Sequence, residues 1–238
     1  MNTLFINRVL IDWTRIPEES YLRGIPALSG VSEIPLAHPV TFFVGENGTG
    51  KSTLLEAIAV ASGFNPEGGT RNYSFSTYDS HSDLHTALRL SRGVRRARSG
   101  YFLRAESFYN VATREEEYSR GPGGVPKHFH ERSHGESFLS LAGDFRPDGL
   151  YLLDEPEAAL SPQRQLTLLR QISRCADAGA QFIIATHAPI LLALPGAGIL
   201  TFDDGSIRPC AYEETGSYRI TELFIRNREQ LLKRLLSD

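Results

Sequence analysis

The segment between positions 40 and 62 constrains the fold of this chain more than any other. Residues 45–52 read G-E-N-G-T-G-K-S, after the apolar run V-T-F-F-V and before a stretch whose apolar residues recur at helical spacing. A strand, a glycine-rich loop and a helix in this order predict a phosphate-binding loop, because glycine N–H groups can turn inward on phosphate oxygens at the positive end of the new helix. The alternative is a glycine-rich turn with a chance Lys-Ser pair, and the flanking strand and helix argue against it.

The residue types of this loop predict how phosphates are held. Lys51 is expected to reach the β- and γ-phosphates, and the Ser52 hydroxyl is expected to ligate the Mg²⁺ that bridges them. We expect the whole loop and the next residue to contact the nucleotide: Gly45, Glu46, Asn47, Gly48, Thr49, Gly50, Lys51, Ser52 and Thr53.

Composition narrows the class of protein. The 238 residues are 41% hydrophobic and 22% charged, which is ordinary for a soluble globular protein. The net charge of -3 is not that of a general nucleic-acid binder, and two cysteines imply no disulfide framework. The N-terminal residues lack the apolar core of a signal peptide, and the longest apolar stretch is too short to span a bilayer. We therefore expect a cytoplasmic protein with no direct membrane insertion.

The order of apolar runs predicts an α/β fold with a mostly parallel sheet flanked by helices. Strands are expected at 3–11, 40–44, 100–104, 150–153, 181–185, 198–202 and 206–210, and helices at 52–62, about 107–117, 161–178 and 189–194, with an amphipathic C-terminus. The turn-rich and basic region between these blocks reads as a smaller variable helical and loop region. We expect one domain, 1–238, with this variable subdomain at about 63–130, between the phosphate loop and a later loop at about 132–137.

Two acids follow the apolar strand at 150–153. A strand that ends in carboxylates places them at the carboxyl edge of the sheet, where the phosphate loop also lies. Asp154 is suited to hold Mg²⁺, and Glu155 can polarise the attacking water. The alternative interpretation is that these residues form a turn with a helix cap. The presence of a complete phosphate loop in the same chain argues against it.

The sequence resembles the ABC-type ATPases, and within them the small stand-alone bacterial predicted ATPases (AAA/SMC-like). The resemblance rests on the loop at 45–52, on L-L-D-E-P-E-A-A-L-S-P at 152–162, on R-S-H-G-E-S at 132–137 and on I-I-A-T-H at 183–187. It spans roughly residues 42–187. It implies a P-loop NTPase fold of ABC/SMC-like type, with ATP and Mg²⁺ as ligands.

The resemblance also implies a head-to-tail dimer. ATP would lie between the phosphate loop of one chain and the segment R-S-H-G-E-S at 132–137 of the other, which corresponds to the signature loop of the family. Ser133 and the Gly135 N–H would contact the γ-phosphate in trans, and His187 would contact the γ-phosphate and the attacking water, so that Lys51, Glu155 and His187 form the catalytic set. Helix or strand-end caps are the alternatives for Ser133 and His187.

Several positions depart from the family pattern. The signature loop begins with Arg132 and has His134 in place of a glycine, and Ser161 stands where an aspartate is usual. No glutamine occurs between Lys51 and Ser133, so the glutamine that senses Mg²⁺ is absent, and Glu106 is a candidate substitute. Trp13 and Tyr21 are candidates to stack on adenine.

Other features leave alternatives open. The five arginines at 89–98 fit either a nucleic-acid or acidic-partner surface or, more commonly, a solvated helix face. His128, His130 and His134 are too loosely spaced to predict a metal site.

The resulting hypothesis is an enzyme that binds and hydrolyses Mg-ATP, dimerises around it, and drives or signals to an unknown protein or nucleic-acid partner. The alternatives are a non-catalytic ATP-dependent switch or docking protein, and the motor subunit of a membrane transporter.

Overall fold

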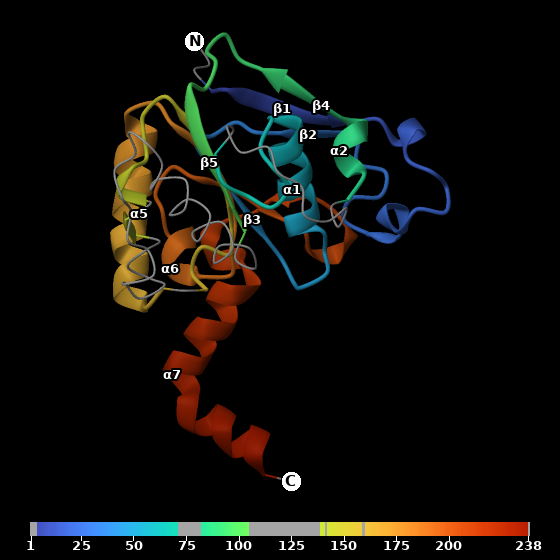
Figure 1. The fold of residues 1–238 in the computed structure, drawn as a ribbon. Helices are drawn as coiled ribbons and strands as arrows, with labels where there is room; N and C mark the ends of the chain where they lie inside the picture. Colours follow the sequence, from blue (N-terminus) through green and yellow to red (C-terminus); the bar gives the residue numbers. More distant parts are fainter. Residues whose placement is uncertain (1–3, 71–81, 105–138, 141, 159, 238) are drawn as a thin grey trace.

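A six-stranded sheet forms the centre of the computed structural model, which describes residues 4–70, 82–104, 139–140, 142–158 and 160–237 (Figure 1). Five of its strands run parallel and the last pairs antiparallel with its neighbour. In spatial order the strands are β5 (Ser99–Arg104), β6 (Gly149–Asp154), β7 (Gln181–Ala185), β3 (Val40–Val44), β8 (Gly198–Thr201) and β9 (Arg208–Pro209).

A second, antiparallel sheet covers one side of the molecule. Its order is β2 (Glu33–Pro35), β1 (Ile6–Ile11), β4 (Leu88–Arg92). Helix α1 (Lys51–Ala61) contacts strands of both sheets, and the short α2 (Leu84–Ala87) lies against it. Helices α5 (Pro162–Asp177) and α6 (Pro189–Leu192) cover the other face of the parallel sheet. Short 3₁₀ helices connect these elements, at Trp13–Arg15, Tyr21–Gly24, Asp203–Gly205 and Tyr212–Glu214.

The hydrophobic core has two layers because successive strand residues point to opposite faces of the sheet. Phe43 and Ile183 belong to the layer shared with α1 and the antiparallel sheet. Their neighbours Phe42 and Ile184 belong to the layer under α5 and α6. Strand β3 is buried at all five positions, so its burial on both faces explains its unbroken apolar run.

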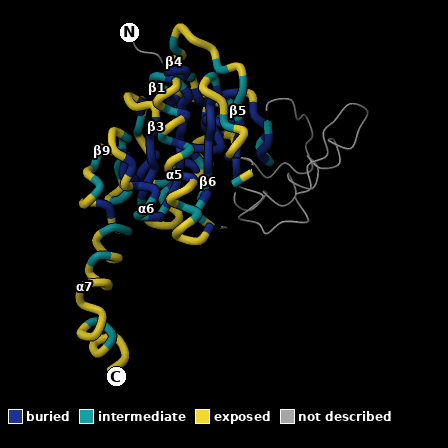
Figure 2. Tube along the Cα trace, turned by 90° about the vertical axis from the view of Figure 1, so that its left-hand side faces the viewer, coloured by how far each residue is buried: buried dark blue, intermediate teal, exposed yellow. Residues whose placement is uncertain are grey.

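Helix α7 (Gly216–Leu236) projects from the body and ends at the C-terminus far from the sheets (Figures 1 and 2). None of its residues is buried, and its backbone departs from helical geometry at Asn227. Within the described ranges, no helix combines the length and the apolar composition that a bilayer crossing requires.

The α/β fold with a mostly parallel, helix-flanked sheet is confirmed. One interpretation was wrong: the arginines at 89–98 do not line a helix face. Arg89 and Arg92 lie on β4, and the other three lie in the turn before or at the entry to β5. Residues 82–104 of the expected variable region therefore contribute strands to both sheets. The helix expected at about 107–117 and the other parts of that region, 71–81 and 105–130, lie outside the described residues.

Candidate functional site: a phosphate loop at the carboxyl edge of the sheet

The phosphate loop joins the end of β3 to the start of α1. Gly50, the residue directly before α1, has φ +98°, and a Cβ atom at this position would lie 2.7 Å from Ile25 Cγ2. Glycine is therefore required here both by the left-handed backbone and by the close approach of the 20–30 segment. The turn lets α1 begin directly at Lys51 with its free N–H groups facing the loop.

The Lys51 ammonium lies inside the loop. Its Nζ donates hydrogen bonds to the carbonyl oxygens of Gly45 (2.7 Å) and Glu46 (2.8 Å), and the residue is only 5% exposed. Burial lowers the pKa of Lys51, and the nearby carboxylates of Glu155 and Asp154 oppose that shift. The loop therefore holds a positive charge at its centre, where the phosphates of a nucleotide are expected to bind.

Ser52 and Asp154 come together across 102 residues of sequence. The Ser52 hydroxyl donates to Asp154 Oδ1 at 2.9 Å, since α1 begins beside the end of β6. Burial raises the pKa of Asp154 to about 6, against the opposing effect of the Ser52 hydrogen bond. Two hard oxygen atoms at this distance, one of them from a partly buried carboxylate, fit the ligand preference of Mg²⁺.

Glu155 and His187 lie next to this pair, at the ends of β6 and β7. Glu155 adopts a left-handed backbone conformation (φ +47°), and its N–H donates to Ala185 O at 2.9 Å. His187 Nε2 lies 4.0 Å from Glu155 Oε1. The backbone N–H of His187 donates to Glu157 Oε1 at 2.7 Å, which fixes the chain just after β7. Strain at a non-glycine residue is typical of functional sites, where the surrounding structure enforces it.

Asp203, to which the sequence analysis gave no role, supports the phosphate loop. Its Oδ1 accepts the Glu46 N–H at 2.9 Å, and its Oδ2 accepts the Thr201 hydroxyl at 3.1 Å. The available signal was that Asp203 follows a buried strand and that parallel strands share one carboxyl edge. That β8 lies directly beside β3 could not be read from the sequence.

An ion pair joins α1 to β5 one helical turn beyond Ser52. Arg104, the last residue of β5, contacts Glu56 Oε2 at 2.8 Å, and Glu56 Oε1 accepts the Ser82 N–H at 3.0 Å. Arg104 pairs in register with Asp154, and its charge lowers the pKa of Asp154 within the net upward shift. A basic residue therefore ends β5, beside the acidic residue that ends β6.

Several expected participants are not brought to this site by the described structure. Ser133 and Gly135, with the rest of the signature loop, and the candidate Glu106 lie outside the described residues, as do His128, His130 and His134. Trp13 donates its indole N–H to Val31 O at 2.8 Å and packs against the core, whereas Tyr21 is largely exposed. In the described part of the chain, no three His, Cys, Asp or Glu side chains gather as a metal cluster.

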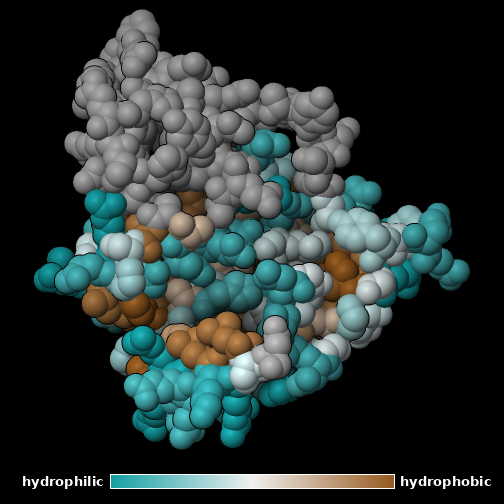
Figure 3. All heavy atoms as spheres, turned by 90° about the horizontal axis from the view of Figure 1, so that it is seen from below, coloured by the Kyte–Doolittle hydropathy of each residue, from teal (hydrophilic) through white to brown (hydrophobic). Residues whose placement is uncertain are grey.

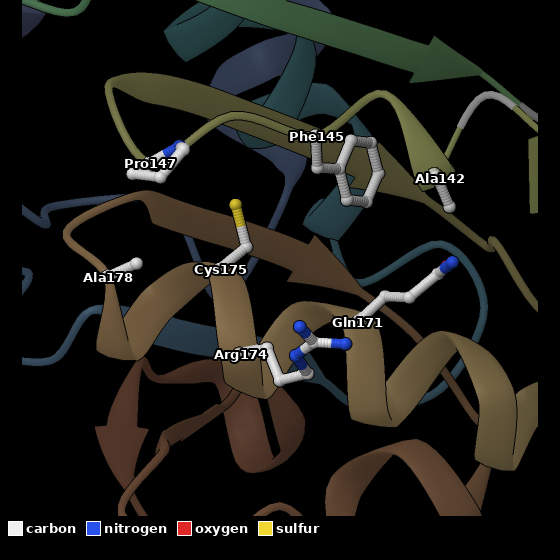
Figure 4. A pocket seen from close by; sticks show the side chains of 8 residues that line it. Ala142, Phe145, Pro147, Gln171, Arg174, Cys175 and Ala178 are labelled. Carbon is white, nitrogen blue, oxygen red and sulfur yellow. The ribbon is translucent and has the colours of Figure 1, made fainter.

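A cavity of about 190 Å³ opens beside the loop. It is lined by the end of β3 and the start of the loop (Val44, Gly45, Glu46), by Thr186, His187 and Asp203, and by the first turns of α7 (Gly216, Ser217, Ile220). A larger cavity of about 340 Å³ lies away from the loop, where Cys175 points from α5 toward Phe145 and Pro147 (Figure 4). Burial raises the pKa of the Cys175 thiol to about 11, so this sulfur is a poor nucleophile.

Two family models match parts of the chain that carry this site. A family model described as "AAA domain" matches residues 21–121, which contain the phosphate loop. A second, described as "AAA domain, putative AbiEii toxin, Type IV TA system", matches residues 137–193, which contain Asp154, Glu155 and His187. No curated protein matches the sequence.

The solved structures that are similar to the chain include an SMC head domain and a part of an ABC transporter complex. The SMC head domain from Thermotoga maritima is 16% identical, with 87% of this chain and 100% of that chain covered, at a TM-score of 0.47. CbiO1 from Clostridium perfringens, part of the ABC transporter complex CbiONQ, is 16% identical, with 95% and 97% covered, at a TM-score of 0.48. The predicted resemblance is confirmed at the level of AAA-type domains: models of such domains match both the segment with the phosphate loop and the segment with Asp154, Glu155 and His187.

Proposed function

We propose that this chain binds Mg-ATP at the phosphate loop and hydrolyses it between two copies of itself. The observation that carries the proposal is the convergence of Lys51, Ser52 and Asp154 at one point of the sheet edge, with Ser52 Oγ 2.9 Å from Asp154 Oδ1. A buried cation and a pair of hard oxygens are the groups that a magnesium-bound triphosphate requires.

Each residue then has a definite task. The loop N–H groups and Lys51 bind the β- and γ-phosphate oxygens, and Lys51 exchanges its contacts with Gly45 O and Glu46 O for the phosphates. Ser52 and Asp154 would hold Mg²⁺, which neutralises phosphate charge when bound. Asp203 keeps the start of the loop in place by accepting the Glu46 N–H.

Glu155 acts as the general base and His187 orients the water and the γ-phosphate. Their side chains lie close together, with His187 Nε2 4.0 Å from Glu155 Oε1, so that one water beside the pair can contact both atoms. A water held between a carboxylate and an imidazole is well placed for attack once its proton can pass to Glu155. The second copy would complete the site with Ser133 and Gly135, which the proposal takes from the family resemblance.

The test compares two substitutions. Glu155→Gln keeps the size of the side chain but removes the base, so the variant should bind Mg-ATP, accumulate as a dimer and lose at least about 100-fold in phosphate release. Lys51→Ala should lose ATP affinity in calorimetry because the loop loses its cation. Hydrolysis at the parent rate by Glu155→Gln would show that the base is assigned wrongly. An unchanged ATP affinity of Lys51→Ala would rule out this loop as the nucleotide site.

A further inference from the structure

Helix α7 carries apolar side chains that the described structure covers only in part. Ile220 is 68% exposed, Leu223 47% and Phe224 43%, on the half of the helix nearest the body. Figure 2 shows the helix as mostly exposed along its length, and Figure 3 shows hydrophobic atoms among hydrophilic ones at this end of the molecule. Amphipathic helices gain most of their stability from packing, so a projecting helix of this kind implies a second surface.

The position of α7 points to the side from which that surface comes. Gly216, Ser217 and Ile220 line the cavity of about 190 Å³ together with Glu46 of the phosphate loop and His187. In Figure 1 the helix leaves the body on the same side as the junction of β3 and α1. Any molecule that closes over the phosphate loop from this side must therefore pass along the first half of α7.

Charge favours another copy of the chain as that molecule. Helix α7 holds five basic and two acidic side chains, a net charge of +3. The whole chain has a net charge of -3, so the remainder carries -6. A basic helix that projects from an acidic body is attracted to the acidic body of a second copy.

The area that a stable interface needs also favours a second copy of the chain as the partner of α7. A stable interface buries about 800 Å² on each partner, with an apolar centre and a polar rim. The groups around the phosphate loop are mostly polar, and the exposed side chains of α7 add the apolar area that they lack. We propose that the first half of α7, through Ile220, Leu223 and Phe224, packs against a second copy of this chain when two copies close on ATP. This inference rests on the proposed function.

The test uses the full chain with Glu155→Gln, which traps the ATP-bound state. Leu223→Ser combined with Phe224→Ser removes apolar contact without touching the cavity or the loop. The matched control is Leu235→Ser with Leu236→Ser, at the far end of the same helix, where the residues are 70% and 77% exposed. Light scattering after size-exclusion chromatography, with and without Mg-ATP, gives the dimer dissociation constant, and calorimetry gives ATP affinity under monomeric conditions.

We expect the Leu223/Phe224 variant to raise the dissociation constant of the ATP-bound dimer at least about tenfold, while the ATP affinity of the monomer stays unchanged. The control variant should change the dimer dissociation constant by less than about twofold. Equal dimerisation in all three proteins would overturn the assignment of α7, although the ATP-driven dimer itself would stand. If the Leu223/Phe224 and Leu235/Leu236 variants weaken the dimer equally, the contact is not confined to the first half of α7, and that part of the proposal is wrong. Failure of the parent to bind ATP or to dimerise would overturn the proposed function and this inference together.

Discussion

At the scale of single residues, Asp154 shows a conflict between function and stability. Its pKa in the folded protein is about 6, above the ordinary value of 3.8, because the carboxyl is buried. The folded state therefore binds this proton more tightly than the unfolded state. The contribution of this proton to the free energy of unfolding is fully present below about pH 4 and is lost as the pH rises through 6. At neutral pH the ionised carboxylate lowers the free energy of unfolding, and a bound cation would offset this loss.

We predict that Asp154→Asn is more stable than the parent at pH 8 in the absence of nucleotide. The gain should approach about 3 kcal/mol, the free energy that corresponds to two pKa units, because the amide carries no charge and can still accept the Ser52 hydrogen bond. Urea unfolding at pH 8 and pH 4 measures it, and the difference should disappear at pH 4. Mg²⁺-dependent ATP binding should be lost in the same variant. A variant less stable than the parent at pH 8 would contradict this account.

At the scale of elements, one side chain joins the two sheets. Gln181 begins β7 and is 1% exposed. Its Oε1 accepts the N–H groups of Phe5 and Ile6, both at 2.9 Å, and its Nε2 donates to Ile6 O at 2.8 Å. The antiparallel sheet is thereby fixed to the parallel one at the start of β1.

We predict that Gln181→Met lowers the free energy of unfolding by about 3–5 kcal/mol. The methionine leaves two backbone donors and one acceptor buried without partners, at about 1–3 kcal/mol each before partial relaxation. Chemical denaturation measures the loss. Gln163→Met is the control, because Gln163 is exposed on α5, and it should change stability by less than about 0.5 kcal/mol. A loss in Gln181→Met no larger than in the control would mean that water replaces the amide.

The sequence predicted local elements well and pairings between distant elements poorly. The strand–loop–helix unit and the position of Asp154 follow from short patterns of apolar residues, glycine and acids. The contacts of Gln181 with Ile6 and of Asp203 with Glu46 join residues 175 and 157 positions apart, and they depend on strand order, which no local pattern encodes.

The arginines at 89–98 were misinterpreted although a local signal was present. Leu88, Leu90 and the polar residues between them alternate with the period of a strand, so the signal for β4 was present and the helical interpretation missed it.

Two of those arginines have structural contacts that composition alone could not reveal. Arg92 donates to Ala61 O at the last residue of α1, and Arg95 reaches Gly179 O just beyond α5. A cation near the C-terminal end of a helix is stabilising because it opposes the negative end of the helix dipole. The cluster is therefore divided between helix ends and solvent, which weakens its interpretation as one nucleic-acid surface.

At the scale of the whole molecule, the proposed cycle makes stability depend on concentration. A ligand that binds only the folded state stabilises it by about 2.7 kcal/mol at a hundred times its Kd. A chain of this size gains about 2–4 °C in Tm for each kcal/mol. If ATP also bridges two copies, mass action adds a term that grows with protein concentration, whereas a monomeric complex has no such term.

We predict that the Tm of Glu155→Gln in saturating Mg-ATP rises by roughly 5–10 °C over the nucleotide-free protein and continues to rise as the protein is concentrated. The nucleotide-free protein should show no such dependence, because its folded state is not linked to a partner. Differential scanning calorimetry over a hundredfold range of protein concentration measures both. Lys51→Ala is the control, and it should keep one Tm at every concentration, with or without Mg-ATP. A Tm that rises with Mg-ATP but is independent of protein concentration would mean that the chain acts on ATP as a monomer, and Ser133 and Gly135 of a second copy would then have no place in the site.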